Sequence, residues 1–212
     1  MKPIDFRPDD WGVLIFIIGR PGSGKTTFAH LCISNINDNW PVCKIGYIDE
    51  QTLLLNSLKN LRSGQIDWLD SGQFVVNDRT IFDHLIIKLK DIAAEEIKKK
   101  DLLLIEYVES DYDDLSDKFS ELLVAKFLIL YMDASLDKCI ERNLNRAQKF
   151  PLLSPPSSVI EKYYSKDDCI SISDLLKDRL VRIRNNFESV NDLHPQVRSV
   201  CKLIQNICQN KS

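Results

Sequence analysis

The fold is decided by the stretch Gly19-Arg20-Pro21-Gly22-Ser23-Gly24-Lys25-Thr26. It matches the pattern G-x-x-x-x-G-K-[ST], in which backbone N–H groups and a lysine surround the phosphates of a nucleotide. The apolar run Val13–Ile18 precedes it and predicts a buried strand, and residues 24–35 follow it with the pattern of a helix. Because the motif requires this strand–loop–helix context, a phosphate-binding loop is favoured over an ordinary glycine-rich turn.

The residue types of this loop suit the binding of phosphate. Glycines at positions 19, 22 and 24 let the backbone approach the phosphate oxygens, and successive N–H groups face the anion together with the helix N-terminus. Lys25 is expected to reach the β- and γ-phosphates, and the Thr26 hydroxyl is expected to ligate Mg²⁺. We therefore expect a nucleoside triphosphate, with ATP favoured, and Mg²⁺. The expected nucleotide-binding residues are Gly19, Pro21, Gly22, Ser23, Gly24, Lys25, Thr26 and Thr27.

The composition predicts one globular domain and limits the classes of partner. The 212 residues are enough for one well-buried α/β domain, and 44% hydrophobic with 28% charged residues is ordinary for such a domain. The formal net charge of −3 gives no general attraction to nucleic acid or to an anionic membrane, although a local basic groove stays open. No membrane partner is therefore expected, and a nucleic-acid partner is not indicated.

Cysteine usage and the N-terminal residues predict a cytoplasmic location. The cysteines at positions 32, 43, 139, 169, 201 and 208 are dispersed and form no C-x-x-C pair, so we expect free thiols in a reducing compartment. Residues 1–5 lack the charged and apolar segments of a secretory signal. The apolar run Val13–Ile18 is too short to span a bilayer.

Strand-like and helix-like segments alternate along the chain. After the first strand, further strands are predicted at residues 44–48, 102–105, 127–132 and 180–184. Further helices are predicted near residues 51–61, 78–99, 115–124, 136–148, 159–164 and 197–208. Residues 74–76 stay open between a short strand and a packed loop. The alternation predicts an α/β fold, a three-layer α/β/α sandwich around a mainly parallel five-stranded sheet with a short lid.

Ligands of such sheets bind beyond the carboxyl ends of the strands. Gly19, Asp49, Glu106 and Asp133 each directly follow a predicted strand. All four are therefore expected to border one crevice.

Arg142 and Arg146 lie four residues apart, so both project from one face of the helix expected at 136–148. In the segment 133–146 and in its whole pattern, the chain resembles the adenylate-kinase-like branch of the P-loop kinases, the nucleoside and nucleotide kinases. The resemblance implies one kinase domain over residues 1–212, with an acceptor-binding region at about 49–79 and a lid at about 147–163. It implies that both arginines clamp the transferring phosphoryl group, whereas the alternative is an exposed helix with arginines in salt bridges.

The resemblance also implies roles for two acids. Asp49, with Glu50 beside it, stands where related kinases place an acid that orients or deprotonates the acceptor hydroxyl. The alternative is the N-cap of the following helix, and Asp49 is preferred to Glu50 as the base because it ends the strand. Glu106 stands where an acid of these folds contacts Mg²⁺ or substrate, and the alternative is a surface acid.

Three further segments resemble the family mainly by position. Asp78-Arg79 is similar to the acceptor-binding pair of thymidylate-type kinases, although a helix cap at Asp78 and an exposed Arg79 are the preferred interpretation. Arg62 is a further candidate for contact with an acceptor phosphate. Residues 185–188 stand where the loop beside adenine lies in these kinases, and the alternative is an asparagine-rich turn.

These observations predict an ATP- and Mg²⁺-dependent kinase that moves the γ-phosphoryl group to a small-molecule or nucleoside/nucleotide-type acceptor. Adenylate kinase itself is disfavoured, because its strand-end Asp-Gly-Phe-Pro-Arg is replaced by Ile105-Glu106-Tyr107-Val108. A polynucleotide 5′-hydroxyl kinase, a P-loop ATPase and a nucleotide-gated binding module stay open. A regulatory GTPase is disfavoured because Asn-Lys-x-Asp, the guanine-binding motif, occurs nowhere in the sequence.

Overall fold

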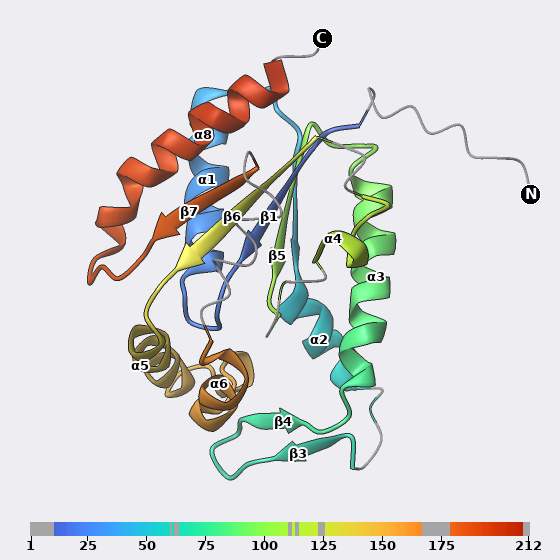
Figure 1. Cartoon of the computed structure of the whole chain (residues 1–212), viewed down its shortest axis with the longest axis vertical. Helices are drawn as coiled ribbons and strands as arrows, with labels where there is room; N and C mark the ends of the chain where they lie inside the picture. The colour runs from blue at the N-terminus through green and yellow to red at the C-terminus, as the bar shows by residue number, and fades with distance from the viewer. Residues whose placement is uncertain are drawn as a thin grey trace, which may run out of the picture.

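Five parallel strands form the central sheet (Figure 1). The computed structural model describes residues 11–59, 61, 64–109, 112, 115–122, 126–166 and 179–209. The strands lie in the order β2-β5-β1-β6-β7 and pair in parallel, so their carboxyl ends meet at one edge of the sheet. Their bounds are β1 (Val13–Ile18), β2 (Ile45–Asp49), β5 (Leu102–Tyr107), β6 (Phe127–Asp133) and β7 (Leu180–Arg184).

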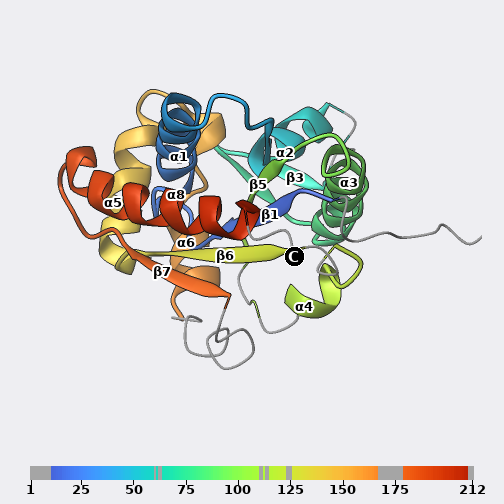
Figure 2. The same ribbon diagram turned by 90° about the horizontal axis from the view of Figure 1, so that it is seen from above.

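Helices cover both faces of this sheet. Helices α1 and α8 lie on one side of β1 and β6, and α4 lies on the other side (Figure 2). The arrangement confirms the predicted three-layer sandwich around a five-stranded parallel sheet. The helices are α1 (Lys25–Asn39), α2 (Glu50–Leu58), α3 (Thr80–Glu96), α4 (Leu115–Lys118), α5 (Leu136–Ala147), α6 (Ser157–Tyr164) and α8 (His194–Gln209), with 3₁₀ turns η2 (Pro151–Leu153) and η3 (Val190–Leu193). None of the helices in the described part of the chain combines the length and the hydrophobicity that a membrane-spanning segment requires.

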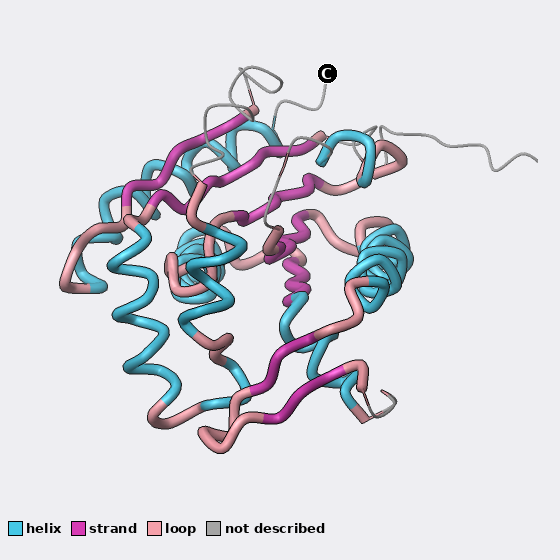
Figure 3. Tube along the Cα trace, turned by 60° about the horizontal axis from the view of Figure 1, so that its bottom comes forward, coloured by secondary structure: helices cyan, strands magenta, loops and turns pink. Residues whose placement is uncertain are grey.

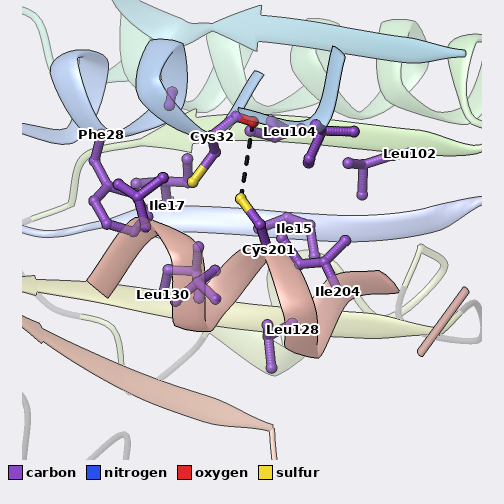
Figure 4. Close-up of a cluster of buried hydrophobic side chains, with 14 of the residues drawn as sticks. Ile15, Ile17, Phe28, Cys32, Leu102, Leu104, Leu128, Leu130, Cys201 and Ile204 are labelled. Atoms are coloured by element: carbon purple, nitrogen blue, oxygen red, sulfur yellow. Dashed lines mark hydrogen bonds between the residues drawn. The ribbon is translucent and has the colours of Figure 1, made fainter. Parts of the chain in front are cut away.

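The alternation of side chains along β1 explains why the sheet has two cores. Val13, Ile15 and Ile17 pack into the core under α1 and α8, while the intervening residues of β1 pack into the core on the opposite face. A strand buried on both faces needs a continuous apolar run, which is the pattern that the sequence shows. Figure 4 shows Ile15 and Ile17 directed toward Cys32 of α1 and Cys201 of α8. The five described cysteines are free, as predicted, and Cys169 lies outside the described residues.

A small antiparallel hairpin stands beyond the carboxyl edge of the sheet. Its strands are β3 (Ile66–Trp68) and β4 (Phe74–Val76), and it lies near α6 at the bottom of the molecule (Figures 1 and 3). Gly72, with φ of +77°, closes the turn through its N–H, which donates to Leu69 O at 2.9 Å. The sequence does not decide between a short strand and a packed loop for β4 and does not predict β3, because a run of three residues shows no clear period.

Three element boundaries differ from the prediction. Helix α1 ends at Asn39 rather than near residue 35, because asparagine and aspartate weaken a helix without breaking it, and Pro41 only follows Trp40. Glu106 lies inside β5 rather than after it, opposite Ile17 of β1 and Asp49 of β2. Helix α4 is shorter than the predicted 115–124, and residues 123–125 lie outside the described part.

Candidate active site

The phosphate-loop motif forms a tight turn between β1 and α1 that only glycine permits at two places. Gly22 has φ of +82°, and a Cβ there would stand 2.4 Å from Cys139 O of α5. Gly24 has φ of +95°, and a Cβ there would stand 2.3 Å from Nδ2 of Asn185. The loop is therefore held against α5 and against the segment that follows β7. Of the other expected loop residues, Ser23 is buried, Pro21 is half-buried and Thr27 is exposed in the first turn of α1.

Lys25 is buried at the start of α1, with 4% of its surface exposed. Its ammonium donates to Gly19 O at 2.7 Å and to Arg20 O at 2.8 Å. Burial lowers the pKa of Lys25, and the nearby charge of Glu106 opposes that shift. An ammonium has three N–H donors, so these two bonds leave one donor for an anion held by the loop.

Thr26, Glu106 and Tyr47 form a short hydrogen-bonded chain beside the loop. Thr26 Oγ1 donates to Glu106 Oε1 at 2.9 Å, and the Tyr47 hydroxyl donates to Glu106 Oε2 at 2.7 Å. Hard oxygen ligands of this kind suit Mg²⁺, which is commonly held by one or two carboxylates together with phosphate and water. No group of three or more His, Cys, Asp or Glu side chains among the described residues could hold a metal by itself. The donor set therefore fits a magnesium ion that is bound jointly with a nucleotide.

The two adjacent acids at the junction of β2 and α2 have different environments. Asp49 is the N-cap of α2: its Oδ1 accepts from the Gln51 N–H at 2.9 Å and its Oδ2 accepts from Thr52 Oγ1 at 2.8 Å. Glu50 is buried, and its Oε2 accepts from the Val108 N–H at 2.8 Å. Both carboxylate oxygens of Asp49 thus hold the helix start, which is the alternative role that the sequence left open for it.

The electrostatic environment of Glu50 is unlike that of a surface acid. Burial raises the pKa of Glu50 to about 8; the Val108 N–H and Lys25 oppose this shift, while Glu109 and Asp49 add to it. Glu50 is therefore a carboxyl group near the phosphate loop that exchanges its proton close to neutral pH. The sequence pattern favours Asp49 over Glu50, because it does not show which of the two neighbouring side chains points into the protein.

The two arginines of α5 also have different partners. Arg142 donates to Asn185 O at 2.9 Å and to Phe187 O at 2.6 Å, so it holds the segment that follows β7. Arg146 donates to Ser154 Oγ at 3.1 Å and to Asn143 Oδ1 at 3.1 Å. Burial lowers the pKa of Arg146, and the charges of Glu106 and Asp49 oppose that shift. Glu106 and Asp49, at the carboxyl edge of the sheet, therefore act electrostatically on Arg146.

The expected lid contacts the expected acceptor-binding region. Gln51 Nε2 donates to Leu153 O at 2.6 Å, and Gln73 Nε2 donates to Ser154 O at 2.9 Å. The guanidinium of Arg79 lies 4.8 Å from the centroid of the Tyr163 ring. These contacts join α2, the hairpin and α3 to the segment between α5 and the end of α6.

Several further residues, some of them predicted from the sequence, have clear places in the structure. Asp78 caps α3 by accepting from the Thr80 N–H at 3.1 Å and from Thr80 Oγ1 at 2.7 Å, and Arg62 lies outside the described residues. Arg20, a variable position of the loop motif, donates to three backbone carbonyls: those of Ala134, Tyr164 and Lys166. The Tyr112 hydroxyl accepts from the Gly19 N–H at 3.0 Å, a contact across 93 residues that no local pattern could indicate.

Comparison with solved structures assigns the fold. No protein-family model matches the chain. Thymidylate kinase from Ehrlichia chaffeensis is 19% identical, with a TM-score of 0.55 over 89% of this chain and 98% of that one. A sugar kinase from Janibacter sp. HTCC2649 is 10% identical, with a TM-score of 0.59 over 92% of this chain and 98% of that one. A gluconokinase from Sinorhizobium meliloti 1021 is 13% identical, with a TM-score of 0.54 over 93% and 96%. The chain therefore has the fold of P-loop kinases, and the varied names of these kinases leave the acceptor open.

The buried carboxyl of Glu50 makes a prediction about stability. Between pH 4.5 and about pH 8 the unfolded chain loses this proton while the folded chain keeps it, so the free energy of unfolding falls as the pH rises. Glu50→Gln keeps an acceptor for the Val108 N–H and removes the titration. The difference in free energy of unfolding between Glu50→Gln and the wild type should therefore increase, in favour of the variant, by about 3 to 5 kcal/mol between pH 4.5 and pH 8.5.

Urea unfolding at a series of pH values measures this difference. The control is Glu161→Gln, which changes an exposed acid on α6 and should follow the wild-type curve. If the free energy of unfolding changed with pH in the same way for the wild type and for Glu50→Gln, the burial of the Glu50 carboxyl would be contradicted.

Proposed function

We propose that this chain is an ATP- and Mg²⁺-dependent kinase that moves the γ-phosphoryl group to a hydroxyl of a small-molecule or nucleoside-type acceptor. The observation that carries the proposal is the meeting, at one sheet edge, of a phosphate loop with its lysine, a Thr26–Glu106 pair, a buried Glu50 and Arg146. The kinase fold of the similar structures supports it. The free thiols of the described cysteines support a reducing compartment such as the cytoplasm.

The loop side of this site would hold the phosphate donor. Loop N–H groups and the N-terminus of α1 bind the β- and γ-phosphates, and Lys25 neutralises their charge. Thr26 and Glu106 would hold Mg²⁺, which when bound offsets charge on the phosphates. Arg146, on the lid side, stabilises charge on the γ-phosphoryl group as it moves. Arg142 fixes the segment 185–187, where the nucleotide base would lie.

The opposite side would hold the acceptor. Glu50 is better placed than Asp49 to take the acceptor proton, because neither oxygen of Asp49 is free of the helix cap. A base is most effective when its pKa lies near the working pH, and the pKa of about 8 for Glu50 meets this condition. Asp49 then fixes the start of α2 and so the position of Glu50.

Loss of the lysine tests the donor side. We expect Lys25→Ala to lower kcat/KM for ATP at least about 100-fold while the far-UV circular dichroism stays unchanged, because charge stabilisation is lost and the apolar cores are untouched. Lys88→Ala, at an exposed position on α3, is the matched control and should retain full turnover. Full turnover in Lys25→Ala would exclude the assignment of the loop.

The adjacent acids can be separated by isosteric variants. We expect Glu50→Gln to lower kcat by about 10²- to 10⁴-fold without weakening ATP binding, because the base is removed. Asp49→Asn keeps a side chain able to cap α2, so kcat should fall less than about tenfold. A larger loss of kcat in Asp49→Asn than in Glu50→Gln would instead identify Asp49 as the base.

The arginines of α5 offer a second matched pair. Arg146→Gln should lower kcat about 10²- to 10³-fold, because it removes charge stabilisation of the transferring group. Arg142→Gln should mainly raise KM for ATP, because the segment held through Asn185 and Phe187 loses its anchor. Steady-state kinetics with varied ATP gives both constants, and an equal loss of kcat in both variants would contradict this division.

A further inference from the structure

The Tyr47 hydroxyl completes a hydrogen-bonded chain that ends at the phosphate loop. Tyr47 lies on β2, Glu106 on the neighbouring strand β5, and Thr26 in the first turn of α1. The hydroxyl donates to Glu106 Oε2 at 2.7 Å, and Thr26 Oγ1 donates to Glu106 Oε1 at 2.9 Å. Glu106 is only 6% exposed, so donors from two different elements fix a carboxylate that water hardly reaches.

The ring of Tyr47 is held by the same helix that carries Thr26. His30 follows Thr26 by four residues, so both side chains lie on one face of α1. The rings of His30 and Tyr47 form a T-shaped contact, with centroids 5.6 Å apart and an interplanar angle of 67°. Contacts at the ring and at the hydroxyl together fix the position of the Tyr47 side chain.

This chain of hydrogen bonds determines which way the Thr26 hydroxyl faces. A threonine hydroxyl has one proton to donate and two lone pairs that accept. Because the proton is directed to Glu106, the lone pairs are left for a ligand at the phosphate loop. A carboxylate free to rotate would let that proton turn elsewhere. The Glu106 oxygen that Thr26 does not contact is held by Tyr47, so Tyr47 limits this rotation.

We infer that Tyr47 is a positioning residue for the metal ion that is bound together with the nucleotide. It acts through Glu106, whose fixed carboxylate keeps the lone pairs of Thr26 free for Mg²⁺. The inference rests on the proposed function and concerns only its binding of nucleotide and metal. Since Tyr47 donates to Glu106 and not to the loop, its loss should weaken metal binding and leave the contacts of the phosphates unchanged.

Tyr47→Phe tests this inference, because it removes the hydroxyl and keeps the ring against His30. The full chain receives one equivalent of a non-hydrolysable ATP analogue and is titrated with Mn²⁺, while electron paramagnetic resonance measures the free ion. We expect the variant to bind Mn²⁺ at least about tenfold more weakly than the wild type, because groups that orient metal ligands have effects of this size. Calorimetry without metal should give the wild-type affinity for the analogue, which also shows that the variant is folded.

Two further variants separate positioning from a general structural role. Glu106→Gln should weaken Mn²⁺ binding by itself, and adding Tyr47→Phe to it should cause little further loss, because Tyr47 acts through that carboxylate. Tyr107→Phe is the matched control, since it removes a buried hydroxyl that donates to Glu109 Oε2 at 2.8 Å on the opposite face of β5. This control should bind Mn²⁺ as the wild type does.

The possible outcomes distinguish this inference from the proposed function. Unchanged Mn²⁺ binding in Tyr47→Phe, even with a lower Tm, would mean that the hydroxyl only satisfies a buried acid; the inference would be overturned and the kinase function would stand. A wild type that binds the analogue and Mn²⁺ but transfers no phosphoryl group would overturn the kinase function, and the Mn²⁺ titration would still decide the role of Tyr47. A wild type that binds neither would overturn both.

Discussion

The hydrogen bond from Thr26 Oγ1 to Glu106 Oε1 joins the helix of the phosphate loop to a strand 80 residues away in the sequence. It exists because β1 and β5 pair in parallel with Ile17 opposite Glu106. Side chains alternate along a strand, so a slip of one residue would turn Glu106 to the other face of the sheet. An acid buried to 6% exposure is tolerated in this strand because hydrogen bonds from Thr26 and Tyr47 satisfy both of its oxygens. The register of the sheet thereby decides where a nucleotide and its metal could be held.

Arginine side chains position the segments around that edge. Arg20 joins the loop to the end of α6, and Arg142 holds the segment after β7, in both cases through backbone carbonyls. A guanidinium presents several donors in a fixed planar arrangement, so one side chain can hold two segments at once. Asn185 adds a bond from its Nδ2 to Ser23 O at 2.7 Å, which fixes the loop from the same side. Arg146, held by neutral side chains only, remains available to an anionic group.

The sequence predicts the fold and the strand–loop–helix unit of the phosphate-loop motif well because their signals are local. A continuous apolar run, a glycine-rich loop and a helix that follow one another specify β1, Lys25 and α1 without distant contacts. The proposed acceptor side depends on tertiary contacts that have no local pattern. Whether Asp49 or Glu50 turns inward is set by how α2 begins, and Tyr112 reaches the loop only because of the path taken after β5. The hairpin was missed because each of its strands has only three residues.

The most direct measurement follows the γ-phosphorus of labelled ATP after incubation with the protein, Mg²⁺ and pooled hydroxyl compounds. We expect the label to move into a phosphomonoester of one compound, with ADP formed in equal amount. Label found only in inorganic phosphate, or left entirely in ATP, would contradict the claim that this chain transfers a phosphoryl group to a hydroxyl.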